Sequence, residues 1–198
     1  MTRLEQQLAF ILEIDKLKQI MRRTRLLHGG EELGRFENTA EHCWHISLMA
    51  VVFAEHSNEP VDIVRVIRML LVHDLVEIDA GDTPAFGEQG SKEELEAAGA
   101  ERIFGMLPED QRNEFIVLWQ EFEGRVTAES RFANAVDRFM PTFQNITNKG
   151  GSWEDFSVTR AKADARLSPI AEGSDALWGL VKGVLDEGES RGYFKDPA

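Results

Sequence analysis

One stretch of the sequence, Met69–Asp82, constrains the fold and chemistry of this chain more than any other. It begins as an apolar segment with helical spacing, and at its centre a histidine precedes an aspartate, His73 and Asp74. Burying a carboxylate among leucines and valines is unfavourable unless a positive group binds it. A divalent metal ion is the simplest such group, so other parts of the chain are expected to supply further ligands.

Apolar residues recur at helical spacing along the chain, and no strand-like alternation of any length is present. The sequence therefore predicts an all-α helical bundle of about six to eight helices. A single domain is expected over 1–198, with the core motif region at about 17–148 and the C-terminal helices of 152–198 packed on it. The expected helices are Arg3–Leu27, Thr39–Asn58 with Thr39 as its cap, Glu59–Ile78, three that open at Ser91, Pro108 and Thr127, Asp155–Leu167 and Ser174–Ser190.

Composition excludes some classes of partner. The formal net charge is −13, which disfavours binding to the phosphates of a nucleic acid polymer but allows a small anionic ligand. The longest apolar run, Ile46–Ala54, is far shorter than the ~20 residues of a membrane span, so no membrane partner is expected. The one cysteine, Cys43, has no partner for an internal disulfide, which favours a cytoplasmic location.

Two further residues place metal-binding chemistry on predicted helices. His42 lies near the start of the second helix, and Asp137 lies on the apolar face of the sixth, within Ala-Asn-Ala-Val-Asp-Arg-Phe-Met. Together with His73 and Asp74 they form a set of two imidazoles and two carboxylates. Such a set suits a first-row divalent ion and leaves positions open for water and substrate.

Simpler explanations exist for each of these residues alone. A single buried histidine is more often a hydrogen-bonded core residue than a ligand, and Asp137 alone is as well explained by an ion pair with an arginine. The ordered spacing of the whole set, His42, then His73-Asp74, then Asp137, each on its own predicted helix, is what favours a metal site.

This ordered pattern on an all-α chain resembles the HD-domain metal-dependent phosphohydrolases. The motifs Ala-Glu-His at 40–42, His-Asp-Leu-Val-Glu at 73–77 and Ala-Gly-Asp-Thr-Pro at 80–84 resemble the 5′-deoxynucleotidase-like branch. The resemblance covers roughly Leu17–Asn148 and implies a metal-dependent phosphomonoester hydrolase acting on deoxynucleoside 5′-monophosphates. It also implies one bound divalent ion, whether Mn, Co, Zn, Fe, Ni or Mg, and a homodimer.

The resemblance assigns roles to individual residues. Glu77 matches the family's water-activating glutamate, and Asp82 matches the aspartate of its Gly-Asp-Xaa-Pro motif. Arg22, with Arg23 beside it, matches the arginine that binds the substrate phosphate. In the bacterial enzyme a tryptophan follows that arginine, whereas Arg23 and Thr24 follow it here, and the next loop is longer. These departures leave the choice of substrate open.

Three questions stay open at the level of sequence. His45 lies three residues after His42 and is an alternative ligand by spacing, but the Ala-Glu-His match favours His42, so His45 is assigned to substrate binding. No histidine follows His73, which disfavours a two-metal site. The alternatives to a deoxynucleotidase are an HD phosphohydrolase acting on another phosphorylated metabolite or a nucleoside triphosphate, and a non-catalytic metal- or nucleotide-binding domain.

Overall fold

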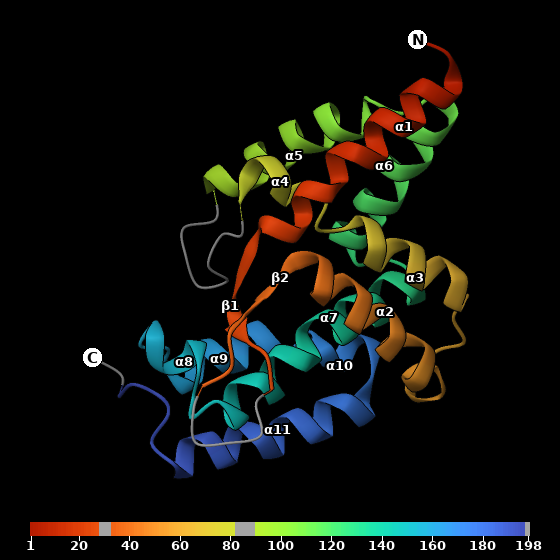
Figure 1. The fold of residues 1–198 in the computed structure, drawn as a ribbon. Coiled ribbons are helices and arrows are strands. Elements are labelled where there is room, and N and C mark those ends of the chain that lie inside the picture. Colours follow the sequence, from red (N-terminus) through yellow and green to blue (C-terminus); the bar gives the residue numbers. More distant parts are fainter. Residues whose placement is uncertain (28–32, 82–89, 197–198) are drawn as a thin grey trace.

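The computed structural model describes residues 1–27, 33–81 and 90–196, which form an almost entirely helical molecule (Figure 1). The all-α prediction is confirmed. In chain order the elements are α1 Arg3–Ile14, the 3₁₀ helix η1 Asp15–Gln19, β1 Met21–Arg25, β2 Phe36–Asn38, α2 Thr39–Phe53, the 3₁₀ helix η2 Ala54–His56, α3 Ile63–Val72, α4 Glu77–Ala80, α5 Gly90–Phe104, α6 Glu109–Gly124, α7 Ala128–Thr147, α8 Ser152–Asp155, α9 Arg160–Leu167, α10 Ile170–Gly173 and α11 Asp175–Ser190.

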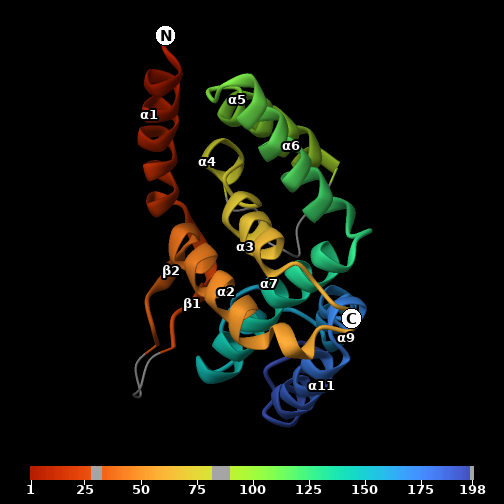
Figure 2. The same ribbon diagram turned by 90° about the vertical axis from the view of Figure 1, so that its right-hand side faces the viewer.

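Helix α7 is the centre of the molecule. It begins with a capping box on Thr127 and contacts α2, α3, α6, α10 and α11. Its buried face carries Phe132, Ala133 and Val136, all without solvent exposure. Figures 1 and 2 show α1, α5 and α6 at one end of the molecule and α9 and α11 at the other, with α7 between them. Residues on α7 therefore lie close to both ends.

The predicted helix Arg3–Leu27 is wrong in its second half. Helix α1 ends at Ile14, η1 follows, and Met21–Arg25 forms a strand antiparallel to β2. The backbone explains the change: the Ile20 carbonyl accepts from the Thr39 N–H at 2.9 Å, and the Leu26 N–H donates to Arg35 at 2.9 Å. The expectation that no strand is present is therefore also wrong, because this short strand, Met-Arg-Arg-Thr-Arg, has no apolar alternation to reveal it.

Smaller corrections concern helix ends. Asn38, not Thr39, caps α2, because its side chain accepts from the Glu41 N–H and Glu41 bonds back to the Asn38 N–H. The predicted helix Glu59–Ile78 is α3, capped by Asp62, followed by a turn and the short α4. The predicted helix Asp155–Leu167 is α8 and α9 with a break between them, where Ser157 has a φ of 50°.

No helix in the described ranges is long and apolar enough to cross a membrane.

Candidate metal centre and adjoining cavity

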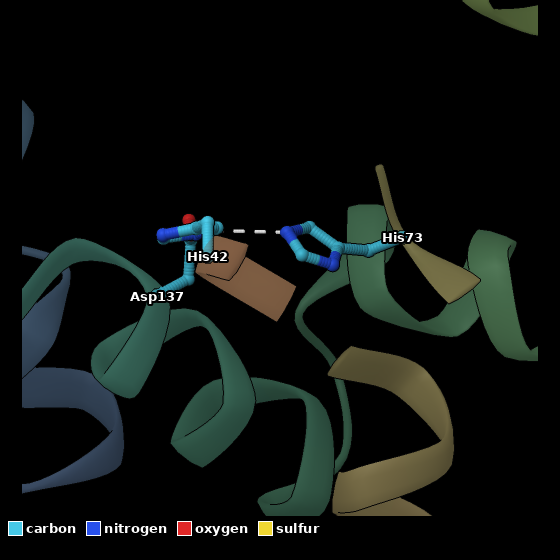
Figure 3. A group of neighbouring side chains, drawn as sticks. All are labelled: His42, His73 and Asp137. Atoms are coloured by element: carbon cyan, nitrogen blue, oxygen red, sulfur yellow. Dashed lines mark hydrogen bonds and ion pairs between the residues drawn. The ribbon is translucent and has the colours of Figure 1, made fainter. Parts of the chain in front are cut away.

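Three of the four predicted ligands meet at the contact of α2, α7 and the turn after α3. His42 lies in the first turns of α2, Asp137 in the middle of α7, and His73 directly after α3. Donor atoms of these three side chains all lie within 4.8 Å of one another. Figure 3 shows His73 pointing towards His42 and Asp137. The closest pair is His42 Nε2 and Asp137 Oδ1 at 2.9 Å, and His73 Nε2 lies 3.8 Å from the same oxygen.

Asp74 joins this cluster through His73, since its Oδ1 lies 3.1 Å from His73 Nε2. Its other oxygen, Oδ2, accepts a hydrogen bond of 2.8 Å from Nη1 of Arg22 on β1. Ligands that share one ion at bond lengths of ~2.1 Å lie about 3 to 4 Å apart, which is the spacing of these nitrogens and oxygens. The structure thus brings His42, His73 and Asp137 together and places Asp74 against His73. The ion pairs of Asp137 in the described part of the chain are with the two histidines, not with an arginine.

The hydrogen-bond partners of the two histidine rings suit a cluster that binds a cation. His73 Nδ1 lies 3.0 Å from the Leu70 carbonyl, which can only accept, so Nδ1 carries a proton and the neutral ring would present the Nε2 lone pair to an ion. That Nε2 is buried and has no hydrogen-bond partner among the described residues. His42 Nδ1 faces a Glu37 oxygen at 3.3 Å, which leaves its Nε2 and the Asp137 oxygen as two acceptors 2.9 Å apart. Two acceptors repel each other at this distance unless a metal ion or a proton lies between them. The mixed imidazole and carboxylate donors suit a metal ion.

The electrostatics favour the same conclusion. Burial opposes a charge on His73, but Asp74 and Asp137 outweigh it and raise the pKa of His73 well above its usual value. Burial likewise acts to raise the pKa of Asp137, but the two histidines lower it well below the usual range. The pKa of Asp74 is also lowered, against its burial, by His73 and Arg22. The carboxylates stay ionised and stabilise positive charge where the histidine nitrogens converge.

Glu37 is a candidate functional residue that the sequence did not reveal. It lies on β2, is only 1% exposed, and holds the far side of the His42 ring. Gln144 of α7 donates to Glu37 Oε1 at 3.2 Å. Arg22 Nε lies 3.8 Å from Oε2, the oxygen that faces His42. A carboxylate behind a ligating histidine fixes the ring's tautomer and orientation. The only signal in the sequence was an acidic residue five positions before His42, which is too common to interpret alone.

The other predicted site residues are placed differently. Glu77 is buried at the start of α4, where Thr39 donates to its Oε2 at 3.0 Å, close in sequence to the ligands. Asp82 lies outside the described residues. His45 is half-buried on α2 with its ring 6.0 Å from that of Trp44, and it belongs neither to the ligand cluster nor to the cavity described next. The structure does not test its role.

A cavity of about 100 Å³ adjoins the cluster on the Asp137 side. Arg22 and Arg23 of β1 line it, so both predicted phosphate-binding residues face the same space as a proposed metal ligand. The remaining walls come from α7, from α8 with the residue that follows it, and from α9. The lining residues are Arg22, Arg23, Thr24, Asp137, Arg138, Pro141, Thr142, Asn145, Ser152, Trp153, Phe156, Arg166 and Leu167.

Much of this lining comes from the C-terminal segment that carried no recognised motif. Trp153, Phe156, Arg166 and Leu167 all follow Gly150, and the sequence assigns the aromatic residues either to packing of this segment or to a subunit interface. Arg138 was also missed, although it directly follows Asp137. No pattern in the sequence brings 153–167 next to β1, because only the packing of the C-terminal helices on α7 does so.

Comparison with known proteins agrees with this geometry. The HD domain family matches residues 14–178. The chain is 30% identical to the 5′-deoxynucleotidase HDDC2 of Bos taurus over 61% of this chain and 60% of the relative, and 28% identical to that of Homo sapiens over 75% and 74%. The alignment thus spans less than two thirds of the bovine relative.

Solved structures extend the similarity to nearly the whole chain. A predicted metal-dependent phosphohydrolase from Magnetospirillum magnetotacticum MS-1 is 48% identical, with a TM-score of 0.91, over 98% of this chain and 96% of that one. A conserved hypothetical protein from Pyrococcus furiosus shares the fold at 19% identity, with a TM-score of 0.59, over 92% and 99%. On the family match and on the ligand set that the fold assembles, this chain belongs to the HD domain family.

Proposed function

We propose that this protein is a metal-dependent phosphohydrolase that converts deoxynucleoside 5′-monophosphates to deoxynucleosides and phosphate. One observation carries the proposal: two histidines and an aspartate from three parts of the chain converge, with a second aspartate against one of the histidines, beside an arginine-lined cavity. The substrate class comes from the relatives named 5′-deoxynucleotidase HDDC2. The 48% identical phosphohydrolase structure supports the reaction type.

His42, His73, Asp74 and Asp137 would hold one divalent ion, with Mn, Co, Zn, Fe, Ni and Mg as the candidates. A bound ion of this kind lowers the pKa of a coordinated water and polarises a phosphoryl oxygen. Glu37 would keep His42 in the ligating orientation. Because imidazole and carboxylate donors are mixed, this set suits Mn, Fe, Co or Zn better than Mg, whose preferred ligands are oxygens.

The residues around the ion have separate tasks. Glu77, oriented by the Thr39 hydroxyl, would accept a proton from the attacking water. As the water oxygen bonds to phosphorus, the ester P–O bond breaks and the leaving 5′-oxygen takes up a proton. Arg22 would contact the phosphoryl oxygens and stabilise their charge, with Arg23 beside it at the cavity. Asp82 is proposed to contact the sugar of the leaving nucleoside or the water.

A substrate panel tests the proposal. Protein loaded with Mn²⁺ or Co²⁺ is expected to release phosphate from deoxynucleoside 5′-monophosphates, and the variant Asp137→Asn is expected to release none. Release from triphosphates or non-nucleotide esters alone would favour another HD phosphohydrolase activity. Metal binding without release from any ester would support the non-catalytic alternative.

We also propose a homodimer. Helix α2 is apolar on its outer side, where Trp44, Leu48, Val51 and Val52 are all at least half exposed. An apolar helix face of this kind is typical of a subunit contact. Sizing chromatography with light scattering tests it: Val51→Glu is expected to convert a dimer to a monomer, and a monomeric wild-type protein would contradict it. A single cooperative domain and a cytoplasmic location remain part of the proposal.

A further inference from the structure

Two arginines in the cavity have no role in the proposed reaction. Arg138 on α7 and Arg166 on α9 both line the space beside Asp137. Neither guanidinium lies within ion-pair distance of a carboxylate in the described part of the chain. Arg138 donates from Nη1 to Asn134 Oδ1 at 3.0 Å, and its Nε is buried without a hydrogen-bond partner among the described residues. Asn134 is itself fixed by bonds to the Phe122 and Ser130 carbonyls at 2.7 and 3.1 Å. The side-chain contact that holds Arg138 in the described part of the chain is therefore with an amide, not with a carboxylate.

These two arginines differ from most of the others in this acidic protein, which form ion pairs with carboxylates. Burial, and next the nearby charge of Arg166, lower the pKa of Arg138 to about 10. By contrast, Arg160, on the same helix as Arg166, pairs with three carboxylates, those of Asp164, Asp186 and Glu189. In a chain of net charge −13, two neighbouring arginines without carboxylates are unfavourable unless a ligand supplies the negative charge.

The walls of the cavity favour the binding of an anion by these two arginines. Trp153, Phe156 and Leu167 give the cavity apolar walls, which lower the local dielectric and favour charge-assisted hydrogen bonds. Guanidinium groups match the oxygens of a phosphate or carboxylate in pairs. The site is distinct from Arg22, whose Nη1 is engaged by Asp74 at the metal cluster.

We propose that Arg138 and Arg166 form a second anion subsite, which binds a phosphate or carboxylate of the substrate other than the phosphate being hydrolysed. This inference rests on the proposed phosphohydrolase function and narrows its substrate class. The preferred substrates then carry two anionic groups, one at the metal cluster and one between α7 and α9. A simple deoxynucleoside 5′-monophosphate fills only the first of these positions.

Kinetics on a matched substrate pair test this. For metal-loaded protein, kcat/KM is expected to be roughly tenfold to a hundredfold higher for 2′-deoxyadenosine 3′,5′-bisphosphate than for 2′-deoxyadenosine 5′-monophosphate. Arg166→Gln is expected to remove this preference, chiefly through KM for the bisphosphate, and Arg166→Lys to restore part of it. Arg191→Gln, at an exposed arginine that pairs with Glu187, is the control and is expected to leave kcat/KM unchanged for both substrates. A parallel comparison with 3-phosphoglycerate tells whether a carboxylate serves as well as a phosphate.

Two results would overturn the subsite. One is a ratio of kcat/KM between the two substrates that is the same in Arg166→Gln as in the wild type. The other is an equal loss of kcat/KM on both substrates, which would place Arg166 on the scissile phosphate.

A second measurement separates this proposal from the proposed function. If the wild-type protein hydrolyses no ester, the function fails, and inorganic phosphate becomes the probe. Phosphate is then expected to raise the melting temperature of the metal-loaded wild type and of the Arg191→Gln control by more than that of Arg166→Gln. Equal stabilisation of all three proteins would overturn the subsite.

Discussion

The metal cluster and the arginine subsite lie side by side on α7 but are built in opposite ways. In the cluster, the proposed ligands lie against one another, and Glu37, Arg22 and the Leu70 carbonyl contact them from outside. In the proposed subsite, Arg138 and Arg166 line one cavity, and neither forms an ion pair with a carboxylate of the described residues. The first region is organised around a cation and the second around an anion. The two regions meet at adjacent residues of α7, since Asp137 belongs to the cluster and Arg138 to the proposed subsite.

The largest expected effect comes from Asp137, which belongs to both regions because it is a proposed ligand and lines the cavity. Asp137→Asn removes the charge that both histidines face, so metal binding and hydrolysis are expected to be lost together. Metal content and phosphate release measure this. Arg138→Gln is the companion variant: it is expected to keep the metal, and loss of metal there would show that the two regions are not separable.

Glu77→Gln is expected to lower kcat by about 10² to 10⁴ while the bound metal is retained, because it removes the proposed proton acceptor but no ligand. The glutamine can still accept from Thr39, so the local hydrogen bond is preserved. Stopped assays with metal analysis of the same sample check both parts. Unchanged turnover would remove Glu77 from the mechanism.

Glu37→Gln is expected to weaken metal affinity by about 10 to 100-fold, since the His42 ring loses the carboxylate that orients it. Titration of the chelator-treated protein with Zn²⁺ measures this, with Glu55→Gln, an exposed change on η2, as the control. Wild-type affinity in Glu37→Gln would show that the cluster does not depend on support from β2.

Phe156→Ala is expected to have the smallest effect. Its ring lines the cavity but is 40% exposed, so unfolding free energy should change by no more than about 0.5 kcal/mol. The KM of the preferred substrate is expected to rise about two- to tenfold through loss of aromatic contact. Thermal melts and steady-state kinetics separate these readouts. A large drop in stability with no change in KM would make the cavity wall purely structural.

The two regions also differ in how far they could be predicted from sequence. His42, His73, Asp74 and Asp137 stood out because each is a polar group within an apolar helical pattern, and the fold brings them together. Arg138 and Arg166 carried no such contrast, because an arginine within a helix is ordinary.

The strand β1 shows that part of the fold, too, could not be predicted from a local sequence pattern. Met21–Arg25 has no apolar alternation, and it becomes a strand because its backbone pairs with Phe36–Asn38. That pairing places Arg22 against Asp74, 52 residues away in sequence. A local pattern cannot predict a contact that depends on which distant segment supplies the hydrogen bonds.

Metal stoichiometry across the ligand set tests the central claim most directly. Purified wild-type protein and the variants His42→Ala, His73→Ala, Asp74→Asn and Asp137→Asn would be loaded with Mn²⁺, desalted and analysed for metal per chain. The arrangement predicts one ion per chain in the wild type and a loss in all four variants, each of them still folded by circular dichroism. An ion retained by folded His42→Ala or Asp137→Asn would contradict it.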